Sequence, residues 1–280
     1  MKTLIQSKTN DVVIDIDSPF VIIGEKINPT GRKKLAAALK ESNYDYVKDL
    51  AIRQVNAGAD ILDINVGVPG ADEVTLLPEV AKIVSETVDV PLCLDSANRD
   101  ALAAALAVLP GKPLVNSVNG EESSLKAVLP VVKEYGASVI GLVMDDNGIP
   151  ADAESRVVIA DKIISRAAKL GISEDDIVID PLVLTVGADS NAGRITLETI
   201  RLVQKEFGVN INLGASNVSF GLPDRHVINQ AFLSVAIGAG ATCAITDPIK
   251  LTSAIRATDL LLGRDTSGMR YLKYWRAQNS

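Results

Sequence analysis

Histidine and cysteine are scarce in this chain of 280 residues, which has one histidine and two cysteines. Because zinc sites draw mainly on several Cys and His ligands, we expect no metal on this chain. A Ser-His-Asp triad would have to use His226, which follows Arg225 near the start of a predicted helix and is better explained as a solvated or capping residue. Cys93 and Cys243 lie in apolar runs typical of buried strands, so we expect reduced thiols and no disulfide.

An excess of positive charge and long apolar runs are also missing. The formal net charge is −7 and the basic residues are spread along the chain, which argues against a nucleic-acid partner. No segment approaches the roughly 18 uninterrupted apolar residues of a membrane span, and the N-terminus has no sustained apolar stretch. We therefore expect a cytoplasmic protein without a membrane partner. No G-x-G-x-x-G motif follows a predicted strand, which makes dinucleotide binding unexpected.

Short apolar runs rich in Val, Ile and Leu alternate with helical patterns along the whole chain. The strand candidates are residues 20–24, 61–64, 91–94, 114–115, 138–143, 177–179, 209–213 and 242–245. The helical patterns, in which apolar residues return every three or four positions, cover residues 35–55, 76–88, 101–108, 125–135, 155–170, 196–207, 224–237 and 251–262. Eight strand-helix units without a composition break predict an α/β fold, a (β/α)8 TIM barrel. A doubly wound open sheet is the alternative.

The first 18 residues have a pattern of their own. Two short apolar segments flank the polar turn "SKTND", which predicts a β-hairpin. We expect this hairpin, residues 1–18, to cover the bottom of a barrel domain formed by residues 19–280.

Asp or Asn follows nearly every predicted strand. In a TIM barrel these positions share one rim, where the chemistry of such barrels lies. Four of these residues are better explained as helix caps: Asn98, Asn119, Asp146 and Asp247. Asp95, Asn116 and Asp180 directly end their strands, so we expect their side chains over the barrel mouth. Carboxylates accept from ring N–H and amino groups and an amide both donates and accepts, which suits a flat, nitrogen-rich heterocycle.

The stretch "LGASNVSFGLP", residues 213–223, follows a predicted buried strand and is unusually polar. Its glycines allow close backbone approach to a ligand, and Pro223 suits the first turn of the next helix. Neither property explains why Asn217 stands beside Ser216 at the expected barrel mouth. Lys26, just beyond the first strand, could be proposed as a Schiff-base lysine of an aldolase, although a solvated or ligand-contacting lysine fits the sequence better.

Seven short sequence segments resemble those of a known protein family. The segments, in order, are "GEKIN", "DINVG", "LCLDSAN", "NSVN", "GIP", "IDPL" and "SNVSFG". Their order and positions resemble the pterin-binding methyltransferases of the dihydropteroate synthase-like superfamily. The likeness is greatest to methyltetrahydrofolate:corrinoid protein methyltransferases, which include the acetogen enzyme, O-demethylase components and the folate domain of cobalamin-dependent methionine synthase. It covers essentially the whole barrel domain.

The resemblance implies roles for particular residues. Asp95, Asn116 and Asp180 would bind the pterin ring edge, with Gly214 and Ser216 in the same pocket. Asn217 matches the asparagine that approaches N5, the nitrogen that carries the methyl group, and would be the catalytic residue. Ile245 would pack on the ring face and Arg225 matches an arginine near the loop. Phe220 stands where the acetogen enzyme has a polar ring contact, so that contact is not carried over.

The implied activity is methyl transfer between N5 of tetrahydrofolate and the cobalt of a corrinoid. Tetrahydrofolate or 5-methyltetrahydrofolate would be the substrate, and a separate corrinoid protein would carry the cobalt. Family members are homodimers, so the resemblance implies a homodimer here. The alternatives are a non-catalytic folate-binding barrel and a dihydropteroate synthase-like condensing enzyme. The second matches less well, because its serine-arginine-proline-glycine loop and late Arg-x-His pair are missing.

Overall fold

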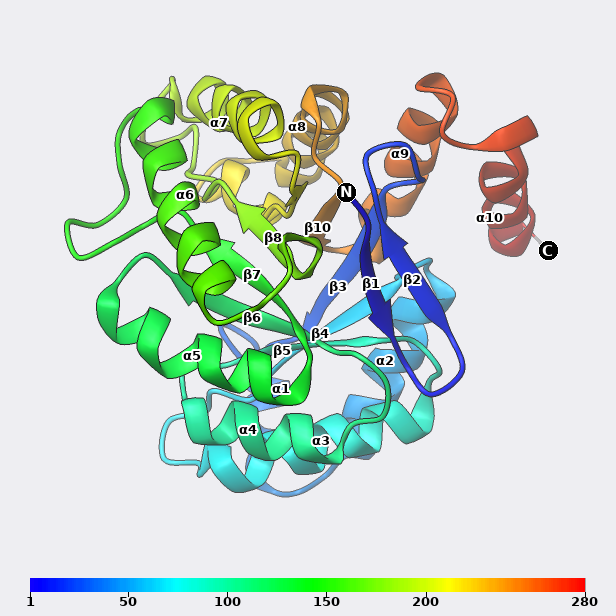
Figure 1. The fold of residues 1–280 in the computed structure, drawn as a ribbon. Helices are drawn as coiled ribbons and strands as arrows, with labels where there is room; N and C mark the ends of the chain where they lie inside the picture. Colours follow the sequence, from blue (N-terminus) through cyan, green and yellow to red (C-terminus); the bar gives the residue numbers. More distant parts are fainter. Residues whose placement is uncertain (280) are drawn as a thin grey trace.

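Eight parallel strands close into a barrel in the computed structural model, which describes residues 1–279 (Figure 1). The strands follow the order β10-β3-β4-β5-β6-β7-β8-β9 around the barrel. The ring closes where Gly214 forms a parallel bridge with Ile245 and the Ile245 N–H donates to the Leu213 carbonyl at 2.9 Å. The predicted TIM barrel is therefore confirmed, and the open-sheet alternative is wrong.

The barrel strands begin close to the predicted apolar runs. They are β3 (Val21–Ile27), β4 (Ile61–Asn65), β5 (Leu92–Asp95), β6 (Leu114–Asn119), β7 (Ser138–Leu142), β8 (Ile177–Asp180), β9 (Asn210–Ile211) and β10 (Cys243–Thr246). Several extend beyond the apolar run into the polar residues that follow it. Those polar residues are thus part of the sheet, and the sheet's hydrogen bonds fix where they stand.

Helices surround the barrel and cover the outer faces of the strands (Figure 1). They are α1 (Lys33–Lys40), α2 (Asp45–Asn56), α3 (Glu73–Thr87), α4 (Arg99–Val108), α5 (Glu122–Tyr135), α6 (Ala153–Lys169), α7 (Ala192–Phe207), α8 (Arg225–Ala239), α9 (Pro248–Leu261) and α10 (Met269–Asn279). Short 3-10 helices lie at η1 (Glu174–Asp176), η2 (Ala215–Ser219) and η3 (Thr266–Gly268). None of the helices within residues 1–279 is both long and apolar enough to cross a membrane.

One helix prediction is wrong. The pattern over residues 35–55 predicted a single helix, but the structure has α1 and α2 separated by a turn. Ser42 adopts a left-handed conformation with φ 53°, and the Asn43 N–H donates to the Ala38 carbonyl at 2.8 Å. Such a left-handed residue satisfies the free carbonyls at a helix end, so the apolar periodicity continues although the helix does not.

The N-terminal hairpin packs against the amino end of the barrel. Its strands are β1 (Thr3–Gln6) and β2 (Asp11–Ile14), and the two pair antiparallel. Ile5 and Ile14 are fully buried and belong to one apolar cluster with the first inward-facing residues of the barrel strands. The Asn210 amide donates to the Ile14 carbonyl at 2.8 Å, which ties the hairpin to β9. Apolar side chains therefore close this end of the barrel.

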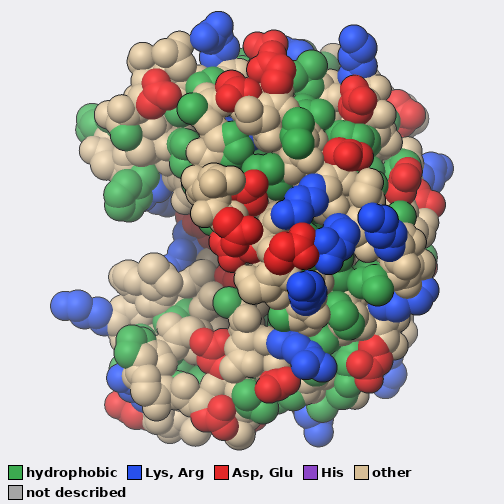
Figure 2. Space-filling model, turned by 60° about the vertical axis from the view of Figure 1, so that its left-hand side comes forward, with side chains coloured by type: hydrophobic (Ala, Val, Ile, Leu, Met, Phe, Trp, Pro, Cys, Tyr) green, Lys and Arg blue, Asp and Glu red, His purple; other side chains and the backbone are tan. Residues whose placement is uncertain are grey.

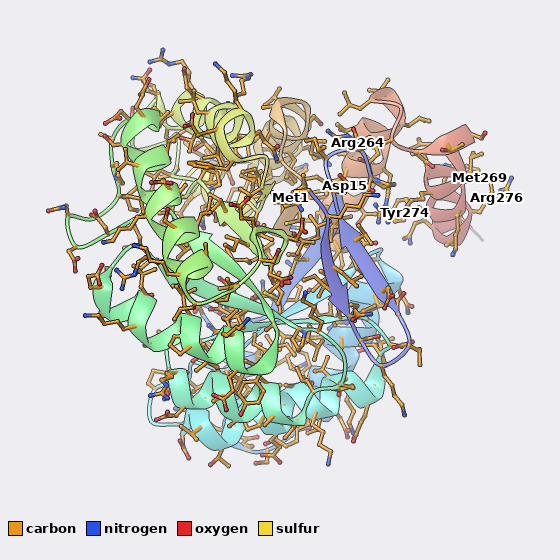
Figure 3. The ribbon with its side chains drawn as sticks, viewed as in Figure 1. Met1, Asp15, Arg264, Met269, Tyr274 and Arg276 are labelled. Carbon is orange, nitrogen blue, oxygen red and sulfur yellow. The ribbon has the colours of Figure 1, made fainter. Side chains whose placement is uncertain are left out.

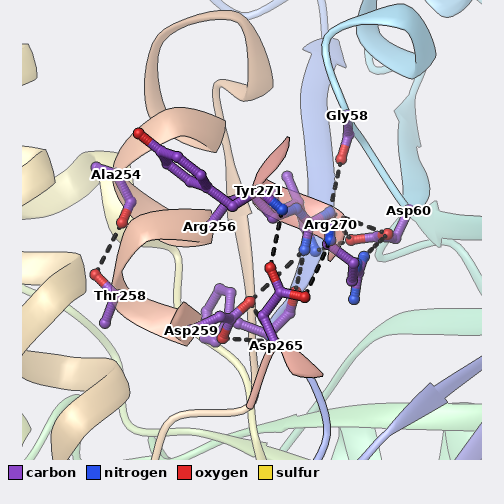
Figure 4. A network of polar contacts seen from close by, with 11 residues as sticks. Gly58, Asp60, Ala254, Arg256, Thr258, Asp259, Asp265, Arg270 and Tyr271 are labelled. Carbon is purple, nitrogen blue, oxygen red and sulfur yellow. Dashed lines mark hydrogen bonds and ion pairs between the residues drawn. The ribbon is translucent and has the colours of Figure 1, made fainter. Parts of the chain in front are cut away.

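Helix α10 stands to one side of the barrel and carries Met269, Tyr274 and Arg276 (Figures 1 and 3). A polar network links its start to the barrel (Figure 4). Asp60 accepts from Arg256 at 3.2 Å and from Arg270 at 2.8 Å. The fully buried Asp259 accepts from the Phe20 N–H at 3.0 Å and lies 3.8 Å from Arg256. The two carboxylates neutralise the charge of the two arginines, and Asp259 holds the backbone at Phe20, directly before β3.

Removing Asp259 should destabilise the fold. Asp259→Ala would leave the Arg256 guanidinium, whose side chain is 5% exposed, without that neighbour and the Phe20 N–H without its acceptor. Arg256 keeps Asp60, so the main loss is the acceptor of the buried Phe20 N–H, which costs about 1–3 kcal/mol of unfolding free energy. Asp49→Ala, which removes an exposed pair with Arg53 on α2, should cost less than about 1 kcal/mol. Urea unfolding followed by circular dichroism measures both, and equal losses would contradict the role given to Asp259.

Candidate functional site

A cavity of about 300 Å³ opens at the carboxyl ends of the barrel strands. It is lined by Glu25, Asn28, Thr30, Arg32, Asp63, Asp95, Asn116, Gly214, Ser216, Asn217 and Ile245. The space-filling view shows a deep notch at the left edge of the molecule, with basic and acidic side chains inside it (Figure 2). We call the cavity of these eleven residues the inner pocket. Its wall is mainly polar, with carboxylates and amides from neighbouring strands.

Two carboxylates from adjacent strands form one wall of the inner pocket. Asp63 on β4 pairs in register with Cys93 on β5, and Asp95 follows two positions later, so both aspartates stand at the same rim. The Asn116 amide donates to Asp63 at 3.2 Å, and the Asn65 amide donates to Asp95 at 3.0 Å. The inner pocket therefore presents two carboxylates that neighbouring amides hold in place.

Burial raises the pKa of both carboxyl groups. Desolvation raises the pKa of Asp63 well above its usual range, and the negative charge of Asp95 raises it further, although the Asn116 hydrogen bond lowers it. Burial likewise raises the pKa of Asp95, against the hydrogen bond from Asn65. Close carboxylates in a low-dielectric site resist ionising together. This wall therefore favours holding a proton.

The 3-10 helix η2 positions Asn217 on the opposite side of the inner pocket. The Asn217 N–H donates to the Gly214 carbonyl at 3.2 Å, which closes the turn. Within residues 1–279 the Asn217 side chain has no hydrogen-bond partner, so its amide is free for a ligand. A Cβ at Gly214 would lie 3.2 Å from the Asn217 amide nitrogen, so glycine leaves that amide its space.

A second cavity, of about 230 Å³, adjoins the inner pocket and shares Glu25, Arg32 and Ser216 with it. Its other lining residues are Lys26, Arg225, His226, Asn229, Asp247, Lys250 and Leu251, and we call it the outer pocket. Ser216 donates to Glu25 at 2.8 Å, on the wall between the two cavities. Lys26 forms an ion pair with Asp247, which also caps α9. This pairing leaves Lys26 unsuited to act as a free amine nucleophile.

Asp180 occupies a different place from the other predicted ring contacts. It ends β8 and is buried, but it is not among the residues lining the inner pocket. Its carboxylate accepts from the Leu182 N–H at 2.8 Å and from the Asn212 amide at 2.6 Å. Burial raises the pKa of Asp180 to about 6, and those hydrogen bonds oppose the shift. Asp180 is thus buried beside Gly214, which lines the inner pocket.

The structure brings most of the predicted site residues together. Asp95, Asn116, Gly214, Ser216, Asn217 and Ile245 line the inner pocket. Arg225 lines the outer pocket, where it donates to the Ser216 carbonyl at 2.7 Å. Sequence reasoning did not assign Asp63, Glu25 or Arg32 to the site. An acidic residue inside an otherwise apolar strand was the available signal for Asp63.

Two of the four predicted helix caps are caps in the structure. Asn98 accepts from the Asp100 and Ala101 N–H groups at the start of α4, and Asp247 accepts from the Ile249 N–H at the start of α9. Asn119 instead accepts from the Glu121 N–H in the turn before α5, whose N-cap is Glu121. Asp146 lies in the turn after β7, and the N-cap of α6 is Asp152, so the prediction for Asp146 is wrong.

A closed parallel barrel with polar residues gathered at the carboxyl ends of its strands has the architecture of TIM-barrel enzymes. Residues 24–247 match the family model described as "Pterin binding enzyme". The chain belongs to this family.

Named relatives narrow the comparison. The chain is 32% identical over 267 residues to the methylcorrinoid:tetrahydrofolate methyltransferase of Eubacterium limosum, with 92% of this chain and 96% of that protein covered. It is 33% identical over 248 residues to methionine synthase of Mycobacterium tuberculosis, which covers 84% of this chain and 21% of the synthase. A dihydropteroate synthase structure from Xanthomonas albilineans has a TM-score of 0.73 at 19% identity, covering 93% of this chain and 98% of that one. That similarity supports the fold alone.

The raised pKa of Asp180 predicts a pH-dependent cost to stability. The neutral carboxyl is favoured in the folded state, so the stabilisation is full below the unfolded pKa near 3.8 and is lost as pH rises through about 6. A shift of this size corresponds to about 3 kcal/mol. The side chain of Asp180→Asn does not titrate. The unfolding free energy of this variant, relative to that of the wild type, should therefore rise by about that amount from pH 4 to pH 8. Urea unfolding across this range tests it, and a constant difference would contradict it.

Proposed function

We propose that this chain is a methyltransferase that moves a methyl group between N5 of tetrahydrofolate and the cobalt of a corrinoid on a separate protein. The near-full-length similarity to the Eubacterium limosum methyltransferase is the observation that carries the proposal. The match covers 92% of this chain and 96% of that relative, whereas the chain corresponds to only about a fifth of the length of methionine synthase. The inner pocket supplies the chemistry that this reaction needs.

The pterin ring would occupy the inner pocket with its nitrogen-rich edge toward Asp95 and Asn116. Carboxylate oxygens accept from the ring N–H and amino groups, and the Asn116 amide can donate or accept. Gly214 and Ser216 would line the pocket beside the ring, and Ile245 would pack on its face. For Asp180 the proposal rests on the resemblance, and its buried position favours support of the pocket floor through Asn212.

Asp63 and Asp95 would share a proton with the ring edge of the pterin. Their raised pKa values favour a carboxyl that keeps a proton, which can be shared with a ring nitrogen. A tertiary amine is a poor leaving group, so methyl departure from N5 requires a proton on that nitrogen. N5 would lie beside Asn217 on the opposite side of the inner pocket, so its proton would arrive from solvent or through a carboxylate network rather than directly from Asp63.

The methyl group would transfer directly between the two atoms. In one direction N5 attacks the methyl carbon, the N5–C bond forms, and the electron pair of the C–Co bond stays on cobalt as Co(I); the positively charged N5 then releases its proton to solvent. In the other direction Co(I) attacks the methyl carbon, and the electron pair of the C–N5 bond returns to the protonated N5 as its lone pair. The Asn217 side-chain oxygen would accept a hydrogen bond from the protonated N5 and so stabilise the positive charge on that nitrogen. It would not supply the proton, because an amide does not titrate near neutral pH.

The corrinoid protein would dock over the barrel mouth, since the methyl group must reach the inner pocket. Phe220 on the loop after β9 is 68% exposed there and could contact the incoming partner. We also propose a homodimer. Leu261, Met269 and Trp275 near the C-terminus are largely exposed, and a second copy would cover apolar surface of this kind. Sedimentation equilibrium measures the mass of the assembly.

A direct assay tests the proposed function. The purified protein is mixed with tetrahydrofolate and either methylcobalamin or a methylated corrinoid protein, and the cobalt spectrum is followed. The methyl-Co(III) spectrum should decay as 5-methyltetrahydrofolate forms. Folate binding without methyl transfer in either direction would favour the non-catalytic barrel. Condensation of a pterin with 4-aminobenzoate, in place of methyl transfer, would favour the synthase-like alternative.

Asn217→Ala should lower turnover by about 10²-fold, because one preorganised hydrogen bond to the reacting nitrogen is lost. Tetrahydrofolate affinity should change much less, since the ring edge contacts remain. Asn43→Ala removes an exposed amide on the turn between α1 and α2 and is the matched control, expected to leave both quantities unchanged. Stopped-flow kinetics and equilibrium titration separate the two effects. Near wild-type turnover in Asn217→Ala would remove this residue from the mechanism.

A further inference from the structure

The outer pocket carries more positive charge than its own carboxylates neutralise. Four of its lining residues are Lys or Arg, and two are Asp or Glu. Lys26 pairs with Asp247 and lies 3.6 Å from Glu25. Arg32 lies 4.0 Å from Glu25 and donates to the Lys26 carbonyl at 2.7 Å. These contacts account for both carboxylates of the outer pocket and leave two cations.

Arg225 and Lys250 are the cations left over. Neither has a carboxylate within ion-pair distance among the residues that the structure describes. Arg225 is nevertheless held in place, because its Nε donates to Ser219 at 3.1 Å and its Nη2 donates to the Ser216 carbonyl at 2.7 Å. Its remaining N–H groups are available at fixed positions. A guanidinium held in this way suits a planar anion such as a carboxylate.

A buried amide provides independent evidence for a ligand. Asn229 on α8 lines the outer pocket and is only 8% exposed, and its Oδ1 atom is buried without a partner in the described chain. Buried polar groups in folded proteins nearly always have a partner, so this unpaired oxygen, which is an acceptor, calls for a ligand that carries an N–H or O–H donor. Helix α8 also begins at Arg225 with no side-chain cap, and the start of a helix favours negative charge. Arg225, Lys250 and the start of α8 therefore suit an anion, and Asn229 Oδ1 suits a hydrogen-bond donor on the same ligand.

The shared wall identifies which part of the substrate can reach this anion site. Glu25, Arg32 and Ser216 line both cavities, so a molecule whose ring fills the inner pocket can extend into the outer one. Folates carry glutamate carboxylates at the end opposite to the pterin. We propose that the outer pocket binds the folate's glutamate tail, whose carboxylates meet Arg225 and Lys250 and whose amide N–H meets Asn229 Oδ1. This inference rests on the proposed function.

Lys250→Gln tests the proposal because Lys250 is exposed at the start of α9 and its side chain supports no other contact in residues 1–279. Loss of one charged contact should weaken tetrahydrofolate binding by about five-fold, and Lys250→Glu should weaken it further. The loss should grow for tetrahydrofolate carrying three glutamates. Binding of tetrahydropterin without the tail should not change. Lys126→Gln, an exposed lysine on α5, is the matched control.

Calorimetric titrations with these three ligands, and with methylcobalamin and methylcobinamide, separate the possible outcomes. Equal affinities of wild type and Lys250→Gln for the tri-glutamate form would overturn the tail assignment while leaving the proposed function intact. Failure of wild type to bind even tetrahydropterin would instead overturn the proposed function. Weaker methylcobalamin binding in Lys250→Gln, with methylcobinamide and folate unaffected, would assign the site to the corrinoid phosphate and overturn the tail proposal.

Discussion

Closure of the barrel between β9 and β10 is the constraint on which the rest of the site depends. Strand β9 has only two residues, and the closure continues beyond it through the Thr242 N–H to the Ile211 carbonyl at 3.0 Å and the Ile245 N–H to the Leu213 carbonyl at 2.9 Å. These bonds place the loop after β9 beside the ends of β10 and β3. Residues about 190 positions apart in the sequence, such as Glu25 and Ser216, thereby become neighbours at 2.8 Å. Without closure the two pockets would have no common wall.

The barrel interior changes from apolar to polar along its axis. At the amino end, the hairpin residues Ile5 and Ile14 seal an apolar cluster. Toward the carboxyl end, Asp63 and Asp180 lie within the barrel with raised pKa values. Burying a carboxylate is unfavourable unless it is hydrogen-bonded or keeps its proton. The hydrogen bonds from Asn116 and Asn212 offset part of this cost. The amino end of the barrel thus stabilises the fold and the carboxyl end carries the site, as is usual in this architecture.

The fold was predictable because strand and helix periodicities are local signals that alternate without interruption. The break between α1 and α2 was not, because it depends on the left-handed Ser42, which no apolar pattern records. In the site, Asp95 and Asn116 were found because they follow apolar runs directly. Asp63 was missed because it lies within a strand, and only the strand register shows that its side chain reaches the mouth. Asp180 met the same sequence criterion as Asp95, yet Asn212 and the Leu182 N–H retain its carboxylate inside the barrel. Partners of this kind are contributed by other strands and have no local sequence signal.

Arg225 links the two pockets in a way that the sequence alone could not reveal. Its guanidinium donates to the Ser216 carbonyl and the Ser219 hydroxyl, which lie before and after Asn217 in η2. The short helix is thereby fixed without using the Asn217 amide, which stays free to meet a ligand in the inner pocket. The same guanidinium directs its remaining donors to the outer pocket. A side chain that both fixes the reactive loop and contacts the far end of the substrate would couple tail binding to the position of Asn217. Binding energy from a remote part of a substrate can be used at the reacting atom only through such a rigid connection.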